Sequence, residues 1–102
     1  MPAKLPILSI GPAVFYSDGD ELALMHWISR IKCIREDSLV FDSRHIYLKR
    51  RPSQSDLWEI IALFYRYNLP MRQLAQFEND ANRNWFKDQR KVWYKRIWNK
   101  GT

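Results

Sequence analysis

The chain has 102 residues, which fits one small domain over residues 1–102 with a core of its own. Hydrophobic residues make up 46% of the sequence and aromatic residues 15%, and this composition excludes a disordered tail. The formal net charge is +6, and the only cysteine, Cys33, excludes an intrachain disulfide. A free thiol suits a reducing compartment, so a cytoplasmic protein is expected. One cysteine and two histidines do not make a zinc site, and neither a metal nor another cofactor is expected.

The excess positive charge comes from the last fifth of the chain. Ten basic and ten acidic residues cancel over residues 1–82, whereas residues 83–102 hold one acid, Asp88. The bases of this block are Arg83, Lys87, Arg90, Lys91, Lys95, Arg96 and Lys100. Such a block attracts nucleic acid, an anionic membrane or an acidic protein, or it forms the solvated face of a basic helix.

The N-terminal segment is apolar but is broken by proline and glycine. An extended conformation is predicted for residues 7–10 and 13–16, with a bend at Gly11-Pro12. The segment is too short to cross a bilayer and has no small-residue cleavage site after it, so neither membrane insertion nor a signal peptide is expected.

The next elements predicted are a helix and a hairpin. Turn residues and acids at 17–21 lead into apolar residues at helical spacing, which predict an amphipathic helix over residues 20–32. Two short β-branched and aromatic runs follow, at 39–41 and 45–48. The three residues between them predict a β-hairpin.

The second half of the chain is predicted to be helical. A helix capped by Asp56 or Ser55 and reaching Tyr67 is apolar on most sides, which is typical of the central helix of a fold. A short helix is predicted after Pro70, and a basic, aromatic-rich helix over residues 83–99. The predicted fold class is therefore α+β: a small antiparallel hairpin or sheet packed against about four helices in a single domain.

Catalytic residues are hard to assemble from this sequence. Cys33 lies in an apolar stretch seven residues after His26, and a buried, inert thiol is favoured over a nucleophile. His45 follows Arg44 and lies near Asp42, so a general base with an orienting acid is conceivable there, although a solvated loop histidine is favoured. We expect that the protein is not an enzyme, with a small nuclease or transferase using His45 and Arg44 as a third hypothesis.

Residues 84–96 resemble a homeodomain recognition helix in their Trp85-Phe86 pair, Arg90, Trp93 and basic tail. The resemblance implies a helix in the DNA major groove. Asp88 stands where that family reads adenine with asparagine, and a carboxylate has no donor for adenine N7. Nucleic-acid binding is therefore the alternative hypothesis, with phosphate contacts from Arg90, Lys91, Lys95 and Arg96.

On a helical wheel of the terminal segment, one broad face is apolar and the other is basic. The apolar face is predicted to contain Trp85, Phe86, Val92, Trp93 and Ile97. Tyr94 and Trp98 lie at the border and are expected to be partly exposed. Aromatic and arginine side chains on a basic rim commonly anchor protein interfaces. The predicted partner-binding residues are Lys87, Arg90, Lys91, Tyr94, Lys95 and Trp98.

A second resemblance extends over more of the chain. Its segments are SDGDE at 17–21, EIIALFYRY at 59–67, MRQL at 71–74, WFKD at 85–88 and WYK at 93–95. Together they resemble small bacterial immunity or antitoxin proteins associated with polymorphic, contact-dependent toxins. The resemblance implies a cytoplasmic, non-catalytic protein that binds a toxin domain and occludes its active site. The basic charge implies that the toxin is acidic at the contact, or that the contact uses the neutral N-terminal part.

Overall fold

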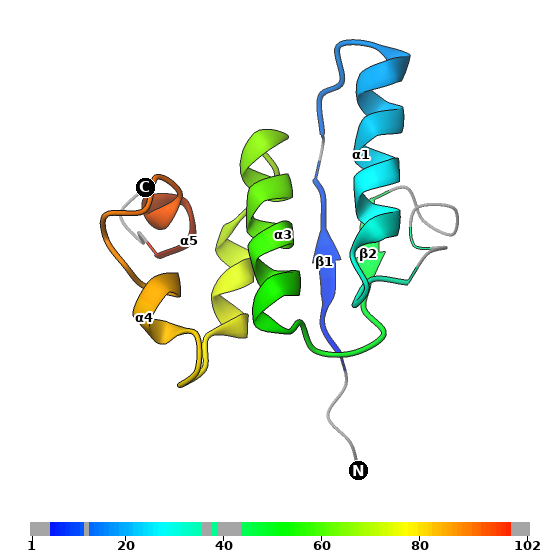
Figure 1. Cartoon of the computed structure of the whole chain (residues 1–102). Helices are drawn as coiled ribbons and strands as arrows, with labels where there is room; N and C mark the ends of the chain where they lie inside the picture. Colours follow the sequence, from blue (N-terminus) through cyan, green and yellow to red (C-terminus); the bar gives the residue numbers. More distant parts are fainter. Residues whose placement is uncertain (1–4, 12, 36–37, 39–43, 99–102) are drawn as a thin grey trace.

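The computed structural model describes residues 5–11, 13–35, 38 and 44–98 of the chain. This part of the chain contains a two-stranded antiparallel sheet and several helices, which confirms the predicted α+β class (Figure 1). None of the helices in these ranges is long and apolar enough to cross a membrane. In chain order the elements are β1 (Ile7–Ser9), α1 (Asp18–Arg30), β2 (His45–Tyr47), α3 (Gln54–Arg66), the 3-10 helix η1 (Arg72–Phe77), α4 (Arg83–Phe86) and α5 (Tyr94–Trp98).

The predicted second arm of the hairpin forms as β2, but it pairs with β1 near the start of the chain. Leu8 lies opposite Ile46, and both side chains are fully buried on the core side of the sheet. The other predicted arm, residues 39–41, lies outside the described residues. β2 also bonds to the backbone that follows α1, where the N–H of Arg35 donates to the carbonyl of Tyr47 at 2.8 Å. The sheet therefore joins segments that are distant in sequence.

At Ser9, a side chain takes the place of a third strand beside β1. The amide of Gln73 accepts from the N–H of Ser9 at 2.8 Å and donates to the carbonyl of Ser9 at 2.6 Å. The same amide nitrogen donates to the carbonyl of Pro70 at 2.7 Å. Gly11, just beyond β1, has φ of +62°, and a Cβ on it would lie 3.0 Å from the Pro70 ring. Glycine suits this left-handed position, and the predicted bend begins here.

Both long helices begin after a serine. The Ser17 hydroxyl accepts from the N–H of Asp20 at 3.1 Å and caps α1. The N-cap of α3 is Ser53, so the predicted caps, Ser55 and Asp56, were wrong. The Ser53 hydroxyl accepts from the N–H of Asp56 at 3.2 Å, and the Asp56 carboxylate accepts from the N–H of Ser53 at 2.9 Å. This reciprocal capping box requires its acid at the third helical position, which places Asp56 inside the helix.

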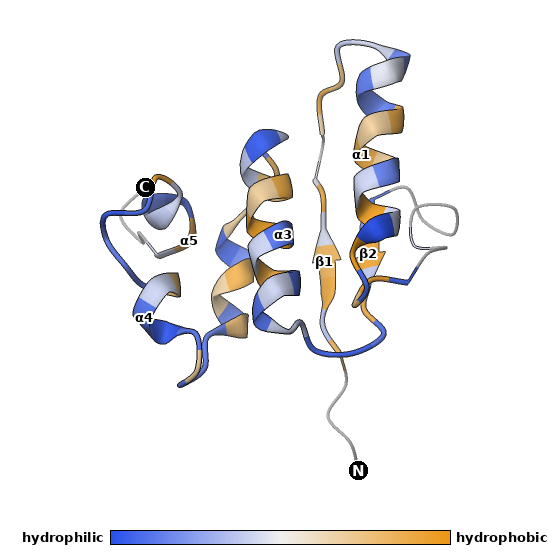
Figure 2. Ribbon diagram, viewed as in Figure 1, coloured by the Kyte–Doolittle hydropathy of each residue, from blue (hydrophilic) through white to orange (hydrophobic). Residues whose placement is uncertain are grey.

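The hydrophobic core is one cluster built around α3. α3 ends at Arg66. Two residues later, the left-handed φ of 57° at Asn68 lets the N–H of Leu69 donate to the carbonyl of Phe64 at 2.9 Å. Figure 2 shows β1 and β2 as mainly hydrophobic, whereas the turn between α4 and α5 is mainly hydrophilic. The buried residues that α3 contributes to the cluster are Leu57, Ile60, Ile61, Leu63 and Phe64, which confirms its predicted place in the core.

The predicted continuous helix over residues 83–99 was wrong. Two short helices, α4 and α5, are separated by turns at 87–93. In a continuous helix the N–H of Arg90 would donate to the carbonyl of Phe86. Here that N–H donates to the Asp88 carboxylate at 2.9 Å, and that carbonyl accepts from the Trp98 indole at 2.8 Å. Side chains have therefore taken both groups of a helical hydrogen bond, and the helix is interrupted there.

Candidate functional site

The six predicted partner-binding residues differ in burial and in the groups that they contact. Tyr94 and Trp98 are half-buried, as predicted, and Lys95 is exposed on α5. Val92, predicted to lie on the apolar face, is 72% exposed, because it lies in the turn before α5 and not in a continuous helix. Phe86, Trp93 and Ile97 are buried, as the wheel predicted.

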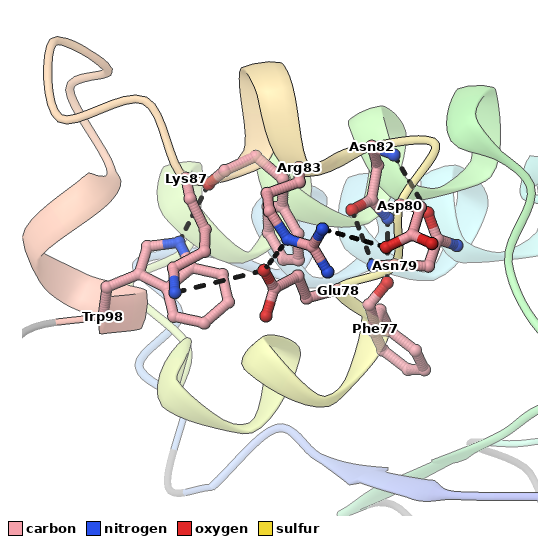
Figure 3. A network of polar contacts seen from close by, with 9 residues as sticks. Phe77, Glu78, Asn79, Asp80, Asn82, Arg83, Lys87 and Trp98 are labelled. Atoms are coloured by element: carbon pink, nitrogen blue, oxygen red, sulfur yellow. Dashed lines mark hydrogen bonds and ion pairs between the residues drawn. The ribbon is translucent and has the colours of Figure 1, made fainter.

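Lys87 and Trp98 belong to a network around Glu78 (Figure 3). The Glu78 carboxylate accepts from Nε of Arg83 at 2.6 Å and lies 4.0 Å from Nζ of Lys87. The same ammonium group lies 4.8 Å from the centroid of the Trp98 ring. Beside this network, the side chain of Asn82 is buried and donates to the carbonyl of Phe77 at 2.8 Å. These contacts hold the chain between η1 and α5, so Lys87 and Trp98 have structural partners.

Arg90 is also paired. Its guanidinium donates to both oxygens of Asp88, at 3.1 and 3.0 Å. These hydrogen bonds, together with the one from the backbone N–H of Arg90, lower the pKa of Asp88 to about 2. Asp88 therefore stays ionised at neutral pH and offsets the charge of Arg90. This pairing also removes the geometry of a DNA recognition helix, because Asp88 and Arg90 lie in a turn.

Lys91 lies elsewhere, beside a surface groove between α1, α3 and the turn before α5. The groove has a volume of about 570 Å³. We call it the aromatic groove. Its lining residues are Trp27, Trp58, Ile61, Ala62, Tyr65, Arg66, Val92 and Trp93. The Trp58 side chain is 41% exposed, which is a large apolar surface left in water by a chain of this size.

The aromatic rings of the groove are held in fixed positions. Trp58 stacks on Trp85 with centroids 4.4 Å apart and meets Trp93 edge-on at 6.4 Å. The Trp85 indole donates to Oε1 of Gln54 at 2.9 Å, and the Trp27 indole donates to Oε1 of Glu59 at 3.0 Å. These contacts preorganise the groove, so a ligand would meet a surface that is already formed.

Cations cover the faces of two of these rings. Nζ of Lys91 lies 5.3 Å from the centroid of Trp58, and the guanidinium carbon of Arg96 lies 4.5 Å from that of Tyr65. Because Trp85 fills one face of Trp58, the Lys91 ammonium occupies the other. Arg96 is held further by a 3.3 Å hydrogen bond from Nη1 to the carbonyl of Tyr65.

Among the described residues, Lys91 and Arg96 at the groove differ from Arg83, Lys87 and Arg90 in having no carboxylate within salt-bridge distance. Arg83, Lys87 and Arg90 lie within 4.0 Å of acidic side chains. Over the described ranges, no carboxylate lies within that distance of the cations near the groove and on α5, which are Arg66, Lys91, Lys95 and Arg96. Of the described cations of the block, Lys91 and Arg96 therefore bring charge without a carboxylate partner to the aromatic groove.

The sequence contains a signal for this groove that the predictions missed. Trp58, Ala62 and Tyr65 are spaced by four and three residues, so they share one flank of α3 next to Arg66. The sequence prediction counts Trp58 and Tyr65 among the apolar residues of a central helix, whereas this flank is partly exposed. The C-terminal segment covers this flank only in part: it places Trp85 and Trp93 against Trp58 and leaves the rest of the flank exposed.

Of the catalytic alternatives, the described residues test only the pair of Cys33 and His26, which is not assembled. His26 is exposed on α1, whereas Cys33 is fully buried after the end of that helix. His45 begins β2 and pairs with Ser9, while Asp42, its expected orienting acid, lies outside the described residues. Within the described ranges no group of three or more histidine, cysteine or acidic side chains could hold a metal ion.

Cys33 is expected to be unreactive in the folded protein. Burial, followed by the charge of Asp56, raises the pKa of its thiol from 9.0 to about 11, so the thiolate is roughly a hundredfold scarcer than in a free cysteine. Alkylation by iodoacetamide at pH 8 should therefore be at least about a hundredfold slower in buffer than in denaturant. Mass spectrometry of timed samples measures both rates, and equal rates would contradict the burial of this side chain.

Comparison of the chain with known proteins gives no match to a family model, to a curated protein or to a solved structure. The chemistry of the aromatic groove is therefore the main indication of function.

Proposed function

We propose that the chain is a non-catalytic protein-binding module that holds its partner at the aromatic groove. The observation that carries the proposal is the combination of exposed, preorganised aromatic rings with cations that have no carboxylate partner among the described residues. Aromatic anchors surrounded by charged groups are typical of the centres of protein interfaces. The positive charge would accelerate association with an acidic partner.

The narrower form of the proposal is an immunity protein of a bacterial cytoplasm. In this form the partner is a toxin domain, and the bound chain covers its active site. Support comes from the sequence resemblance and from the free, buried thiol, which suits a reducing compartment. Neutralisation by occlusion needs no catalytic residue on this chain.

The covered ring faces argue against the nucleic-acid alternative. Single-stranded nucleic acids bind by stacking bases on exposed aromatic faces. At Trp58 and Tyr65 a base would first have to displace Lys91 or Arg96. Recognition of a duplex by a long basic helix is also disfavoured, because α4 and α5 are short and separate.

Site-specific photocrosslinking in the native cells tests the proposal. Benzoylphenylalanine would replace Val92 at the groove and, as a control, Leu22, which is 64% exposed and does not line the groove. We expect a discrete protein adduct at position 92 that resists nuclease and is absent at position 22. An adduct that nuclease removes would overturn the proposal in favour of nucleic-acid binding. The immunity form requires in addition that the purified adduct partner is a toxin that the chain inhibits.

A further inference from the structure

The groove presents hydrogen-bond donors and positive charge, and none of its lining residues is acidic. The indole N–H groups of Trp58 and Trp93 have no acceptor among the described residues, in contrast to those of Trp27, Trp85 and Trp98. Glu59, the acid adjacent to the groove, accepts the Trp27 indole. A ligand of this groove must therefore supply acceptors and negative charge.

The groove is also apolar over much of its surface. Trp58, Val92 and Tyr65 offer side chains that an aliphatic or aromatic group can contact, and Ala62 leaves room between the rings. A phosphate backbone has no such groups. A protein segment that alternates carboxylates with bulky apolar side chains satisfies both requirements.

A second hollow adjoins the aromatic groove but has Asp20 in its lining, so it does not extend the site for an acidic segment. It has a volume of about 520 Å³ and shares Arg66 with the aromatic groove. Its other lining residues are Val14, Tyr16, Asp20, Tyr67 and Asn68. Tyr67 also meets Trp27 edge-on at 6.4 Å, which links the walls of the two hollows. From Trp58 to Arg66 the groove follows α3 for about 12 Å, at 1.5 Å per residue.

We infer that the aromatic groove binds an acidic segment of the partner protein, with its apolar side chains against Val92 and the exposed edge of Trp58 and its carboxylates on Lys91 and Arg96. The inference rests on the proposed function and specifies the chemistry of the partner. Lys91 and Arg96 are already held over the rings, so they lose little side-chain conformational entropy when they pair with a carboxylate.

A library of random 16-residue peptides displayed on phage provides the test. Peptides would be selected on the wild-type chain and counter-selected on the double variant Lys91→Glu/Arg96→Glu. We expect the enriched peptides to be acidic and to contain aromatic or large aliphatic residues. A neutral or basic consensus, or no enrichment, would overturn the inference.

The best enriched peptide would then be titrated against 15N-labelled protein by NMR. We expect the indole signals of Trp58 and Trp93 to shift, and affinity to fall at least tenfold in Lys91→Glu/Arg96→Glu and in Val92→Asp. The control Lys32→Glu/Lys49→Glu has the same net charge, alters exposed cations outside the groove and should stay within twofold of the wild type. Retained amide spectra of each variant show that it is folded.

Two results would overturn the acidic-segment inference without overturning the proposed protein binding. Equal weakening in both double variants would show a nonspecific charge effect and overturn the acidic-segment inference. A nuclease-resistant adduct at position 92 without any groove-binding acidic peptide would keep protein binding and overturn only the stated chemistry. A 15-nucleotide oligothymidylate that shifts the same two indole signals at physiological salt would overturn both.

Discussion

Replacing Phe86 with alanine is expected to lower the free energy of unfolding by about 3–5 kcal/mol. The ring is fully buried and contacts three tryptophans, with centroids 5.1 Å from Trp98, 5.6 Å from Trp85 and 6.0 Å from Trp93. Its removal leaves a cavity where α4, α5 and the wall of the groove meet. A small domain has only about 5–15 kcal/mol of stability in total, so this loss is a large share of it.

Urea unfolding followed by tryptophan fluorescence measures the effect of Phe86→Ala. Val92→Ala is the matched control in the same segment, because its side chain is exposed and its loss should change stability by no more than about 0.5 kcal/mol. Phe86→Leu, which keeps most of the buried volume, should fall between the two. A cost below about 1 kcal/mol for Phe86→Ala would contradict the packing of this aromatic cluster.

Replacing Asp56 with alanine is expected to cost about 2–3 kcal/mol, because one carboxylate has two structural roles. It accepts from the N–H of Ser53 in the capping box, and it accepts from Nη1 of Arg50 at 2.6 Å. The Asp56 side chain is 8% exposed and that of Arg50 is 49% exposed, so the ion pair is partly screened by solvent. Thermal unfolding and urea unfolding at pH 7 measure the loss. Glu21→Ala, which removes an exposed carboxylate from the first turn of α1, is the control.

The same carboxylate predicts a pH dependence. Burial alone would raise the pKa of Asp56, but the hydrogen bonds from Ser53 and Arg50 outweigh it and hold the pKa below its ordinary value of 3.8. Because the carboxylate has a lower pKa in the folded state, its ionised form stabilises the folded protein above pH 3.8. This contribution is lost as the pH falls from 3.8 through the pKa of the folded state. The stability difference between wild type and Asp56→Ala should therefore shrink on acidification. A difference that stays constant from pH 6 to pH 2 would contradict the assignment.

The long helices were predictable because their signals are local. Apolar residues at helical spacing and the serines and acids before them specify α1 and α3, apart from the position of the second cap. The pairing of β2 with β1 is a contact between distant segments, and short local strand patterns contain no signal for it. The break after Phe86 depends on the Trp98 indole, twelve residues away, reaching a backbone carbonyl. Helical periodicity contains no information about that contact.

The candidate site was predictable only in part for a related reason. The sequence places seven cations near the C-terminus, but it does not show which of them meet Glu78 or Asp88. Lys91 was among the predicted residues and lies at the groove, whereas Lys87 and Arg90 are paired elsewhere. The exposed flank of α3 depends on how much of the helix the C-terminal segment covers, which is set by tertiary packing.

The amide of Gln73 has a further consequence for how this protein meets other chains. An open strand edge recruits a strand from a neighbouring molecule, which leads to aggregation, strand exchange or capture of extended peptides. Because that amide bonds both backbone groups of Ser9, it occupies the position that an incoming strand would need. A strand could add at Ser9 only by displacing the Gln73 amide, so β-augmentation is opposed at this point of the sheet edge.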